Sequence, residues 1–352
     1  MAKKRKWSRG KLSLLMLLSL IIITGASILA YDYYIKIFSS NVKENNGFNH
    51  YLNIPSDADY SMVLKIIEEK DILNDMESFK WVAEKMNYPR HIHSGRYFIE
   101  PNLSNRALLK ILRSGLQKPV KLIINKFRKK SKFIHYISQK LEADSLVLHA
   151  LLTDKIFLRA HGLNPDNVMS IFIRNTYEFY WNTSASKFFD KMFNEFDRFW
   201  DYDRLAQAKK LGLSPIEVII LASIVEEETN KQKEKKDIAS VYLNRLNKGM
   251  RLQADPTVRF AMANFNVKRI YKASTKINSP YNTYKHKGLP PGPICLPSIQ
   301  TIDAVLKAKK HNYLYFCAKA DFSGYHTFAC TYKEHLVNAS AYSKELNKRK
   351  IR

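Results

Sequence analysis

The sequence predicts an α+β protein with a transmembrane helix near its N-terminus. The uncharged run over residues 12 to 30 is long enough to cross a bilayer. After it, segments with helical periodicity are mixed irregularly with short strand-like runs, as in α+β domains. The chain has 352 residues, of which 45% are hydrophobic and 26% are charged. That is an ordinary globular composition, and the length suggests two domains, or one domain with an appendage.

The N-terminal segment has the pattern of a membrane anchor. Tyrosines follow the apolar run, and six basic residues precede it: Lys3, Lys4, Arg5, Lys6, Arg9 and Lys11. Basic residues favour the cytoplasmic side, so we expect a cytoplasmic tail over 1–11, a single-pass anchor over 12–34 and the rest of the chain outside the cytoplasm. A cleaved signal peptide is the competing interpretation, but "ILA" before Tyr31 is a poor cleavage site and the apolar region is long for one.

Charge and cysteine content limit the classes of binding partner and the disulfide bonds that the chain can have. The formal net charge is +26, which for an exported chain favours anionic lipid headgroups and acidic cell-wall polymers over nucleic acid. Three cysteines exclude a disulfide framework. Cys317 and Cys330 could pair across a hairpin, although two free buried thiols are the simpler state. His91 and His93 have no acidic or cysteine neighbours in the sequence, so we predict no metal site.

Between the anchor and residue 118 we expect a linker and a small α+β module. Residues 35–49 are mostly polar and aperiodic, which is typical of a linker. Residues 50–118 contain a helix opened by Ser61, a second helical pattern around residues 79 to 86, a strand at 95–101, and a third helix capped by Ser104 and closed by Gly115.

We expect residues 119–352 to form the larger α+β domain. A strand over 120–124 precedes several helices, and an amphipathic helix over 234–248 stops at Gly249. A helix from about Ile299, the strands "NYLYFCA" and "YHTFA" and a final helix opened by a capping box at Thr331 complete it. Two long segments rich in Pro, Asn, Tyr and Gly lie between these elements, and loops of that length are usually functional.

The segment "LASIVEEETNK" is the most informative. Its helix should begin at Ser214, with Pro215 and Glu217 completing the start signal, and it is apolar around most of its circumference before it ends in three glutamates. Ionisation of these carboxyls is disfavoured by the negative end of the helix dipole, by the neighbouring like charges and by burial. At least one carboxyl should therefore have a raised pKa. A protonated carboxyl is suited to general acid catalysis. A solvated helix end paired with nearby lysines is the alternative.

Four stretches carry a family resemblance: "LASIVEEET", "SVYLNRLNKGMRLQADPTV", "SPYNTYKHKGLPPGPI" and "YLYF" followed by "HTF". In this order and spacing, over residues 214 to about 335, the chain resembles the endolytic murein transglycosylase family (MltG/YceG-like). Weaker similarity extends back through residues 175 to 184. The chain departs from the family at Leu296, Pro297 and Ser298, where "NPG" is common, and at residues 125–127, where a Pro-Glu-Gly turn is expected.

The resemblance implies the architecture and the surroundings of the protein. Residues 50–118 would be a LysM-like subdomain and 119–352 a YceG-like catalytic domain. The protein would sit in the cell inner membrane, with the catalytic domain in the periplasm and no cofactor. Its partners would be peptidoglycan glycan strands, cytoplasmic membrane lipids and, as candidates, peptidoglycan synthases.

The resemblance also implies site residues. The first acid of the "IVExE" motif falls on Glu226, which would be the catalytic residue, and the second falls on Glu228, which would orient or anchor a loop. Supporting or substrate-binding roles fall on the "LQxDPT" and "YNTY" motifs and on a strand-end histidine: Gln253, Asp255, Thr257, Tyr281, Asn282, Thr283, Tyr284 and His326.

Residue chemistry gives these positions plausible tasks. Gln253 and Asn282 could hydrogen-bond sugar hydroxyls and acetamido groups, and Tyr281 and Tyr284 could stack on pyranose faces or pack internally. Asp255 could cap a turn or face the cleft, with capping favoured. His326 is expected to orient a loop or to be structural.

The reaction implied by the resemblance is lytic cleavage of the MurNAc-GlcNAc bond. One glutamate would protonate the leaving oxygen, and the muramoyl 6-hydroxyl would then attack the anomeric carbon and lose its proton to the same carboxylate. The products would carry 1,6-anhydroMurNAc ends. The alternatives are a non-catalytic, membrane-anchored peptidoglycan-binding scaffold and a lysozyme-like hydrolase, which differ from this prediction in the product ends.

Overall fold

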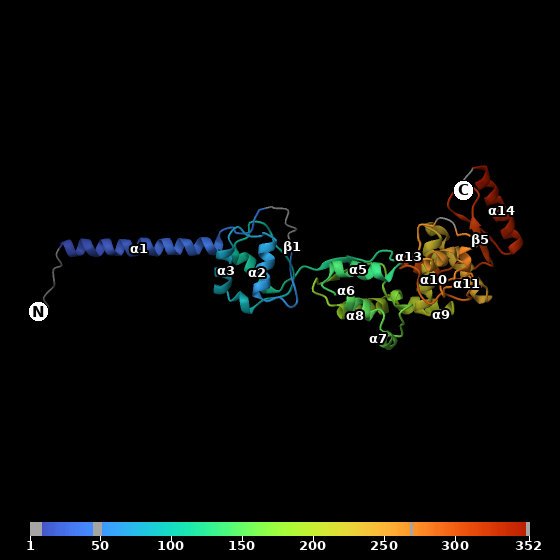
Figure 1. The fold of residues 1–352 in the computed structure, drawn as a ribbon, viewed down its shortest axis with the longest axis horizontal. Helices are drawn as coiled ribbons and strands as arrows, with labels where there is room; N and C mark the ends of the chain where they lie inside the picture. Colours follow the sequence, from blue (N-terminus) through green and yellow to red (C-terminus); the bar gives the residue numbers. More distant parts are fainter. Residues whose placement is uncertain (1–8, 45–50, 268–269, 350–352) are drawn as a thin grey trace. The chain divides into compact units, whose positions relative to one another are not determined.

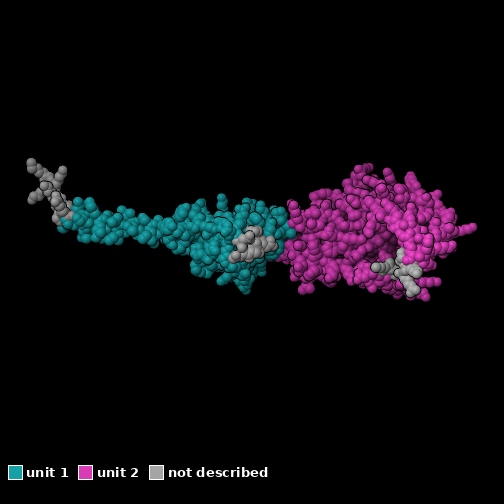
Figure 2. Space-filling model, turned by 90° about the horizontal axis from the view of Figure 1, so that it is seen from above, with its two compact units in different colours: residues 1–120, 180–182 teal, residues 121–179, 183–352 magenta. Residues whose placement is uncertain are grey.

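The computed structural model describes residues 9–44, 51–267 and 270–349. Helices and short strands are mixed along the chain, which confirms the α+β prediction (Figure 1). The chain divides into two compact units, residues 1–120 with 180–182 and residues 121–179 with 183–352 (Figure 2). Within the described part, the strands form three two-stranded sheets, β1 with β2, β3 with β4 and β5 with β6.

The first element, α1 (Arg9–Phe38), is a continuous helix. Its segment Gly10–Phe38 is long and apolar enough to cross a membrane, and its large side chains are exposed. At its C-terminal end it packs on the folded part of its own unit, where the ring of Tyr33 stacks on that of Trp81 with centroids 5.0 Å apart. The predicted tail lies largely in residues 1–8, outside the described residues.

The first unit also contains the elements β1 (Tyr51–Ile54), α2 (Tyr60–Glu69), α3 (Met76–Lys85), η1 (Tyr88–Arg90), β2 (Gly95–Phe98) and α4 (Asn105–Ser114). Strands β1 and β2 are antiparallel, with Tyr51 opposite Phe98. The expected start of α2 at Ser61 is wrong, because Asp59 is the cap and accepts a hydrogen bond from the Met62 backbone. The similarity of this unit to a LysM-like subdomain stays a prediction.

The predicted linker is also wrong in its described part. Helix α1 continues to Phe38, and residues 39–44 pack into the unit. Val42 is 3% exposed, and the buried Asn41 amide donates to Asp75 O and to Asn105 Oδ1, both at 2.7 Å. A buried amide that satisfies several backbone and side-chain partners looks polar in sequence although it belongs to the core. Residues 45–49 lie outside the described residues.

The elements of the second part of the chain are β3 (Val120–Ile123), α5 (Lys130–Lys140), α6 (Ser145–Leu151), α7 (Lys155–Ala160), η2 (Val168–Ile171), β4 (Thr176–Phe179), α8 (Ala185–Phe199), α9 (Tyr202–Lys210), α10 (Pro215–Glu228), η3 (Gln232–Glu234), α11 (Lys235–Asn247), α12 (Asp255–Ala261), η4 (Ser274–Lys276), α13 (Ile299–Leu306), β5 (Tyr315–Ala318), β6 (His326–Ala329) and α14 (Tyr332–Lys348). The sequence did not predict β1 or β4, which are only four residues long.

Helix α10 is the centre of the second unit. It starts as predicted, with a complete capping box between Ser214 and Glu217 and with Pro215 in the first turn. Residues 218–226 are all buried, because α11, α12 and α13 pack around the helix. The helix therefore runs through a closed core and ends, at its terminal glutamates, at the edge of a cavity.

Candidate active site

Glu226 is held in a cationic and hydroxylic cluster. Its Oε1 accepts from Arg174 Nη1 at 2.7 Å and its Oε2 from Lys235 Nζ at 2.8 Å. The hydroxyls of Ser298 and Thr301 donate to the same Oε2. Burial would raise the pKa of this carboxyl, but the bond from Lys235, reinforced by its charge and by Thr301, outweighs burial and lowers the pKa to about 2. Glu226 is therefore ionised at neutral pH and links α10 to α11 and α13.

Glu227 is neutralised in a second cluster. Arg128 forms a bidentate pair with it, through Nε at 2.8 Å and Nη2 at 2.9 Å, and Lys126 Nζ lies 3.0 Å from its Oε1. Burial raises the pKa of Glu227, but the bond from Arg128 and the charge of Lys126 together bring it below its ordinary value. This glutamate is also a poor proton donor.

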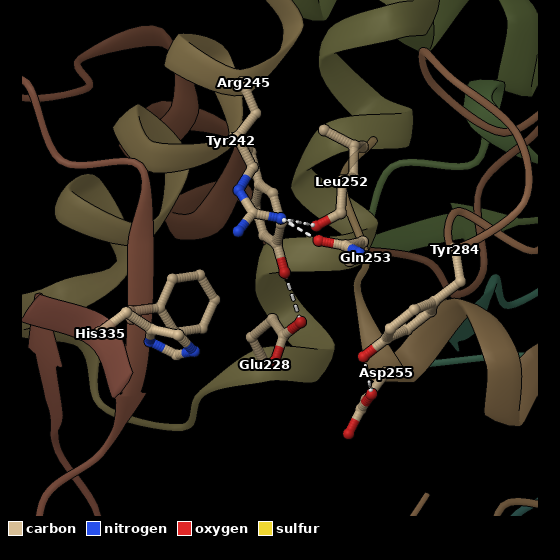
Figure 3. A pocket seen from close by; sticks show the side chains of 9 residues that line it. Glu228, Tyr242, Arg245, Leu252, Gln253, Asp255, Tyr284 and His335 are labelled. Carbon is tan, nitrogen blue, oxygen red and sulfur yellow. Dashed lines mark hydrogen bonds between the residues drawn. The ribbon is translucent and has the colours of Figure 1, made fainter. Parts of the chain in front are cut away.

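Glu228 differs from both neighbours because it faces a pocket. The Tyr242 hydroxyl donates to its Oε1 (Figure 3), and within the described residues no lysine, arginine or histidine forms an ion pair with it. Burial raises the pKa of Glu228 to about 7; the bond from Tyr242 opposes this rise and the negative charge of Asp255 adds to it. Of the three acids, Glu228 is the one that keeps a proton near neutral pH.

The pocket has a volume of about 360 Å³. In Figure 3, Asp255 and Tyr284 lie on one side of Glu228 and His335 on the other, with Arg245 and Gln253 above them. The lining residues come from α10, α11, α12, β5, α14 and the loops between them: Glu228, Tyr242, Arg245, Leu252, Gln253, Asp255, Tyr284, Phe316 and His335.

The geometry does not favour Glu226 as the proton donor. A proton donor needs a carboxyl that is neutral near the working pH, whereas Glu226 is ionised and saturated with hydrogen bonds. The pocket is lined by Glu228 and not by Glu226. The prediction that at least one of the three acids has a raised pKa is confirmed, but that acid is Glu228.

Three other predicted residues line the same pocket. The Tyr284 hydroxyl donates to Asp255 Oδ1 at 2.6 Å. Asp255 makes no capping bond, because the cap of α12 is Ala254, so the favoured capping role is wrong and its carboxylate faces the cavity. Gln253 has a left-handed backbone with φ 51°, which is sparsely populated by residues other than glycine and is often found at functional sites.

Four predicted residues support the pocket from outside it. Thr257 and Thr283 are buried and bond each other through their hydroxyls at 2.9 Å, and Thr283 also accepts from the Ala254 backbone at 3.0 Å. The Asn282 amide is buried and donates to Thr275 O and Ile277 O. The Tyr281 ring packs on Phe260, with centroids 4.7 Å apart. None of the four lines the pocket, so the sugar contacts expected of Asn282 and Tyr281 are not supported.

His326 ties the strand β6 to the segment that follows α10. Its Nδ1 lies 2.9 Å from Glu234 Oε1, and its backbone N–H donates to Glu234 Oε2 at 3.0 Å. The same Glu234 Oε1 accepts from the Thr229 hydroxyl at 2.5 Å. Since Thr229 follows Glu228 directly, this chain of bonds can fix the end of the glutamate-bearing helix.

Sequence reasoning missed the pocket residues Tyr242, Arg245, Phe316 and His335. Tyr242 and Arg245 are three residues apart on α11 and so share a helix face, a spacing that the "SVYLNRL" stretch displays. Phe316 and His335 give no comparable signal, since they join the pocket only through the packing of α14 on β5.

The described residues contain no group of three or more His, Cys, Asp or Glu side chains arranged to hold a metal ion. The three cysteines are free, and Cys330 is exposed rather than buried as expected. The arrangement is instead that of an acid–base site. It offers one protonated carboxyl in a partly enclosed pocket, with an ionisable carboxylate, an amide, two phenols and a guanidinium around it.

Comparison with known proteins identifies the family of this chain. A Bacillus subtilis (strain 168) protein called endolytic murein transglycosylase is 28% identical over 314 residues, which cover 85% of this chain and 86% of the relative. A protein of the same name from Streptococcus pneumoniae (serotype 2, strain D39) is 27% identical over 76% of this chain, which spans only 54% of that relative's length. A crystal structure of a YceG-like protein from Listeria monocytogenes matches with a TM-score of 0.54 and 27% identity over 82% of this chain and 97% of the other. The YceG-like family model matches residues 52–341, a range that includes every residue lining the pocket, and the chain belongs to the YceG-like family.

Proposed function

We propose that this protein is an endolytic peptidoglycan lytic transglycosylase in which Glu228 serves first as general acid and then as general base. The observation that carries the proposal is the contrast within one helix end. Glu226 and Glu227 are paired with cations, whereas Glu228 forms no ion pair with a described residue, faces the pocket and has a pKa of about 7. The names of the relatives support the substrate class.

In the first step, Glu228 gives its proton to the oxygen that links the muramoyl sugar to the next sugar. Positive charge develops on the muramoyl ring as this bond breaks. Asp255, held by Tyr284, has a carboxylate at the same pocket and favours that charge. The negative charge of Asp255 also helps Glu228 to retain its proton before the reaction.

In the second step, the muramoyl 6-hydroxyl attacks the anomeric carbon and its proton passes to the Glu228 carboxylate. The new C–O bond closes a 1,6-anhydro ring, and Glu228 regains the proton that it gave up. Attack from within the same sugar has a high effective concentration, so a second carboxylate nucleophile is unnecessary. The Tyr242 hydroxyl donates to Glu228 and stabilises its ionised form between the two steps.

The placement in the cell belongs to the same proposal. We assign α1 as a single-pass anchor in the cytoplasmic membrane, with the N-terminus in the cytoplasm and the pocket outside it. The length and hydropathy of Gly10–Phe38 and the basic residues before it support this orientation. The glycan strands would then be cut near the membrane where they are made, and peptidoglycan synthases would be candidate neighbours.

The test is the chemistry of the product ends. The full-length protein in detergent is incubated with uncrosslinked glycan strands, and the products are analysed by mass spectrometry. We expect internal cuts with 1,6-anhydromuramoyl ends. Reducing ends would instead indicate a hydrolase, and uncut strands that remain bound would indicate the scaffold alternative.

A further inference from the structure

Arg245 is a buried cation that lines the pocket but has no acidic partner among the described residues. Its side chain enters from α11 and the residue is 8% exposed. All of its hydrogen bonds go to neutral acceptors: Nε to Leu314 O at 2.6 Å, and Nη1 to Arg251 O at 3.2 Å, Leu252 O at 2.8 Å and Gln253 Oε1 at 3.3 Å. Buried charges are usually paired, so this guanidinium lacks the partner that normally accompanies it.

The unused donor of Arg245 belongs to its second terminal nitrogen. Nη2 makes no hydrogen bond to any described residue, and in Figure 3 one terminal nitrogen carries both dashed bonds while the other carries none. The nearby carboxylates are already engaged, since Glu228 accepts from Tyr242 and Asp255 accepts from Tyr284. Nη2 is therefore free to donate to a molecule bound in the pocket.

His335 provides a second unused polar atom in the same corner. Its Nδ1 is buried without a hydrogen-bond partner in the described part of the chain. The His335 ring stacks on Tyr315 with centroids 5.4 Å apart, and the Arg245 guanidinium carbon lies 5.1 Å from the centre of the same Tyr315 ring. Both side chains therefore contact one aromatic ring, and both residues line the pocket.

We propose that Arg245 Nη2 and His335 Nδ1 form a subsite for an acyl oxygen carried on the sugar ring. A guanidinium fork is a strong partner for a carboxylate or a carbonyl oxygen, and a neutral imidazole can donate from Nδ1. Peptidoglycan offers this chemistry from two sources, the lactyl carboxyl group of the muramoyl sugar and the acetamido carbonyl. The inference rests on the proposed function. It adds a specificity element, because the subsite would select acylated sugars over plain polysaccharides.

The test measures binding without turnover. The full-length Glu228→Gln chain in detergent keeps the ligand intact, and isothermal calorimetry gives the Kd. Three synthetic tetrasaccharides of the alternating glycan are compared: the parent with free lactyl carboxylates, one with these carboxylates reduced to alcohols, and one with each acetamido group replaced by a hydroxyl. The protein variants add either Arg245→Lys or, as a control, Arg198→Lys. Arg198 is exposed, and its one ion-pair partner among the described residues is its helix neighbour Glu195.

We expect Arg245→Lys to raise the Kd of the parent ligand roughly tenfold or more, as loss of a hydrogen bond to a charged group does, and Arg198→Lys to leave it unchanged. The ligand that lacks the recognised oxygen should bind weakly to the Glu228→Gln chain, both with and without Arg245→Lys. For this ligand the two proteins should have the same Kd. Loss of the difference with the alcohol ligand identifies the lactyl source, and loss with the hydroxyl ligand identifies the acetamido source.

The subsite would be overturned if Arg245→Lys raised the Kd of all three ligands by the same factor, or if it left the Kd of the parent ligand unchanged. Arg245 also supports the Leu252 and Leu314 backbone, so Arg245→Lys could fail to fold. In that case the three ligands are compared on the Glu228→Gln chain alone, where equal affinities would also refute the subsite. The Kd values test the subsite, whereas the product-end assay tests the proposed function. Each of the two proposals can therefore be refuted independently of the other.

Discussion

Replacing Glu226 by glutamine tests whether this acid is structural. The change removes the negative charge that Arg174 and Lys235 share, and leaves two cations beside each other, with Lys235 only 5% exposed. Breaking a buried ion pair on one side destabilises proteins by about 3 to 5 kcal/mol. The fall in the pKa of Glu226 from 4.5 to about 2 gives a similar size, about 3 kcal/mol at about 1.4 kcal/mol per pH unit.

The sign of the pH dependence follows from the same fall. A carboxyl whose pKa is lower in the folded chain stabilises the fold above its unfolded pKa and loses that contribution as the pH falls toward its folded pKa. The difference between wild type and Glu226→Gln should therefore be full at pH 7 and should shrink between about pH 4.5 and pH 2.

The assay is urea unfolding of the full-length chain in detergent, followed by circular dichroism. The matched control is Glu228→Gln, the same substitution two residues away. Glu228 has a raised pKa and no cationic partner among the described residues, so the wild-type carboxyl lowers stability progressively between about pH 4.5 and pH 7. This control should therefore lose no stability at pH 7 and can gain it. If Glu226→Gln unfolds at the wild-type urea concentration at pH 7, the structural assignment of Glu226 fails.

The remaining predictions concern the reaction and one close backbone contact. Turnover should fall above about pH 7 as Glu228 loses its proton, measured as kcat/KM from pH 5 to 9, and a flat profile would contradict a Glu228 acid. Tyr242→Phe removes a hydrogen bond that favours the ionised form of Glu228, so kcat/KM should begin to fall at a higher pH than in the wild type. A fall at the wild-type pH would show that this hydrogen bond does not lower the pKa of Glu228. Gly292→Ala places a Cβ 2.0 Å from the Asp166 carbonyl oxygen and should destabilise the chain by several kcal/mol in urea unfolding. Gly25→Ala, where no atom lies within 4 Å of the new Cβ, is the control, and equal stability of both variants would refute the close contact.

The sequence predicted well those features that depend on neighbouring residues. The start of α10 and the start of α14 follow from capping boxes at Ser214 and Thr331, and α4 follows from Ser104 and Gly115. In each case the cap and the first turn lie within a few residues of each other. Local hydrogen bonds of this kind are readable without knowledge of the fold.

The features that were mispredicted depend on distant residues. The sequence indicates that one glutamate of the three should keep its proton, but it cannot say which one, because Arg174 reaches Glu226 from 52 residues away and Arg128 reaches Glu227 from 99 residues away. The rise in the Glu228 pKa is likewise due to burial by elements that meet only in the fold. The linker prediction fails at Asn41 for the same reason, since its partner Asn105 lies 64 residues further on.

The central claim is that Glu228 holds a proton near neutral pH, and a titration of its side-chain carboxyl carbon tests this most directly. With ¹³C-labelled glutamate in the full-length chain, and with Glu228→Gln and Glu226→Gln to assign the signals, the chemical shift is followed from pH 3 to 9. We expect the Glu228 signal to titrate with a midpoint at about pH 7 and the Glu226 signal to stay in its ionised position throughout. A Glu228 midpoint near 4.5, the ordinary value for a glutamate, would contradict the assignment of Glu228 as the acid.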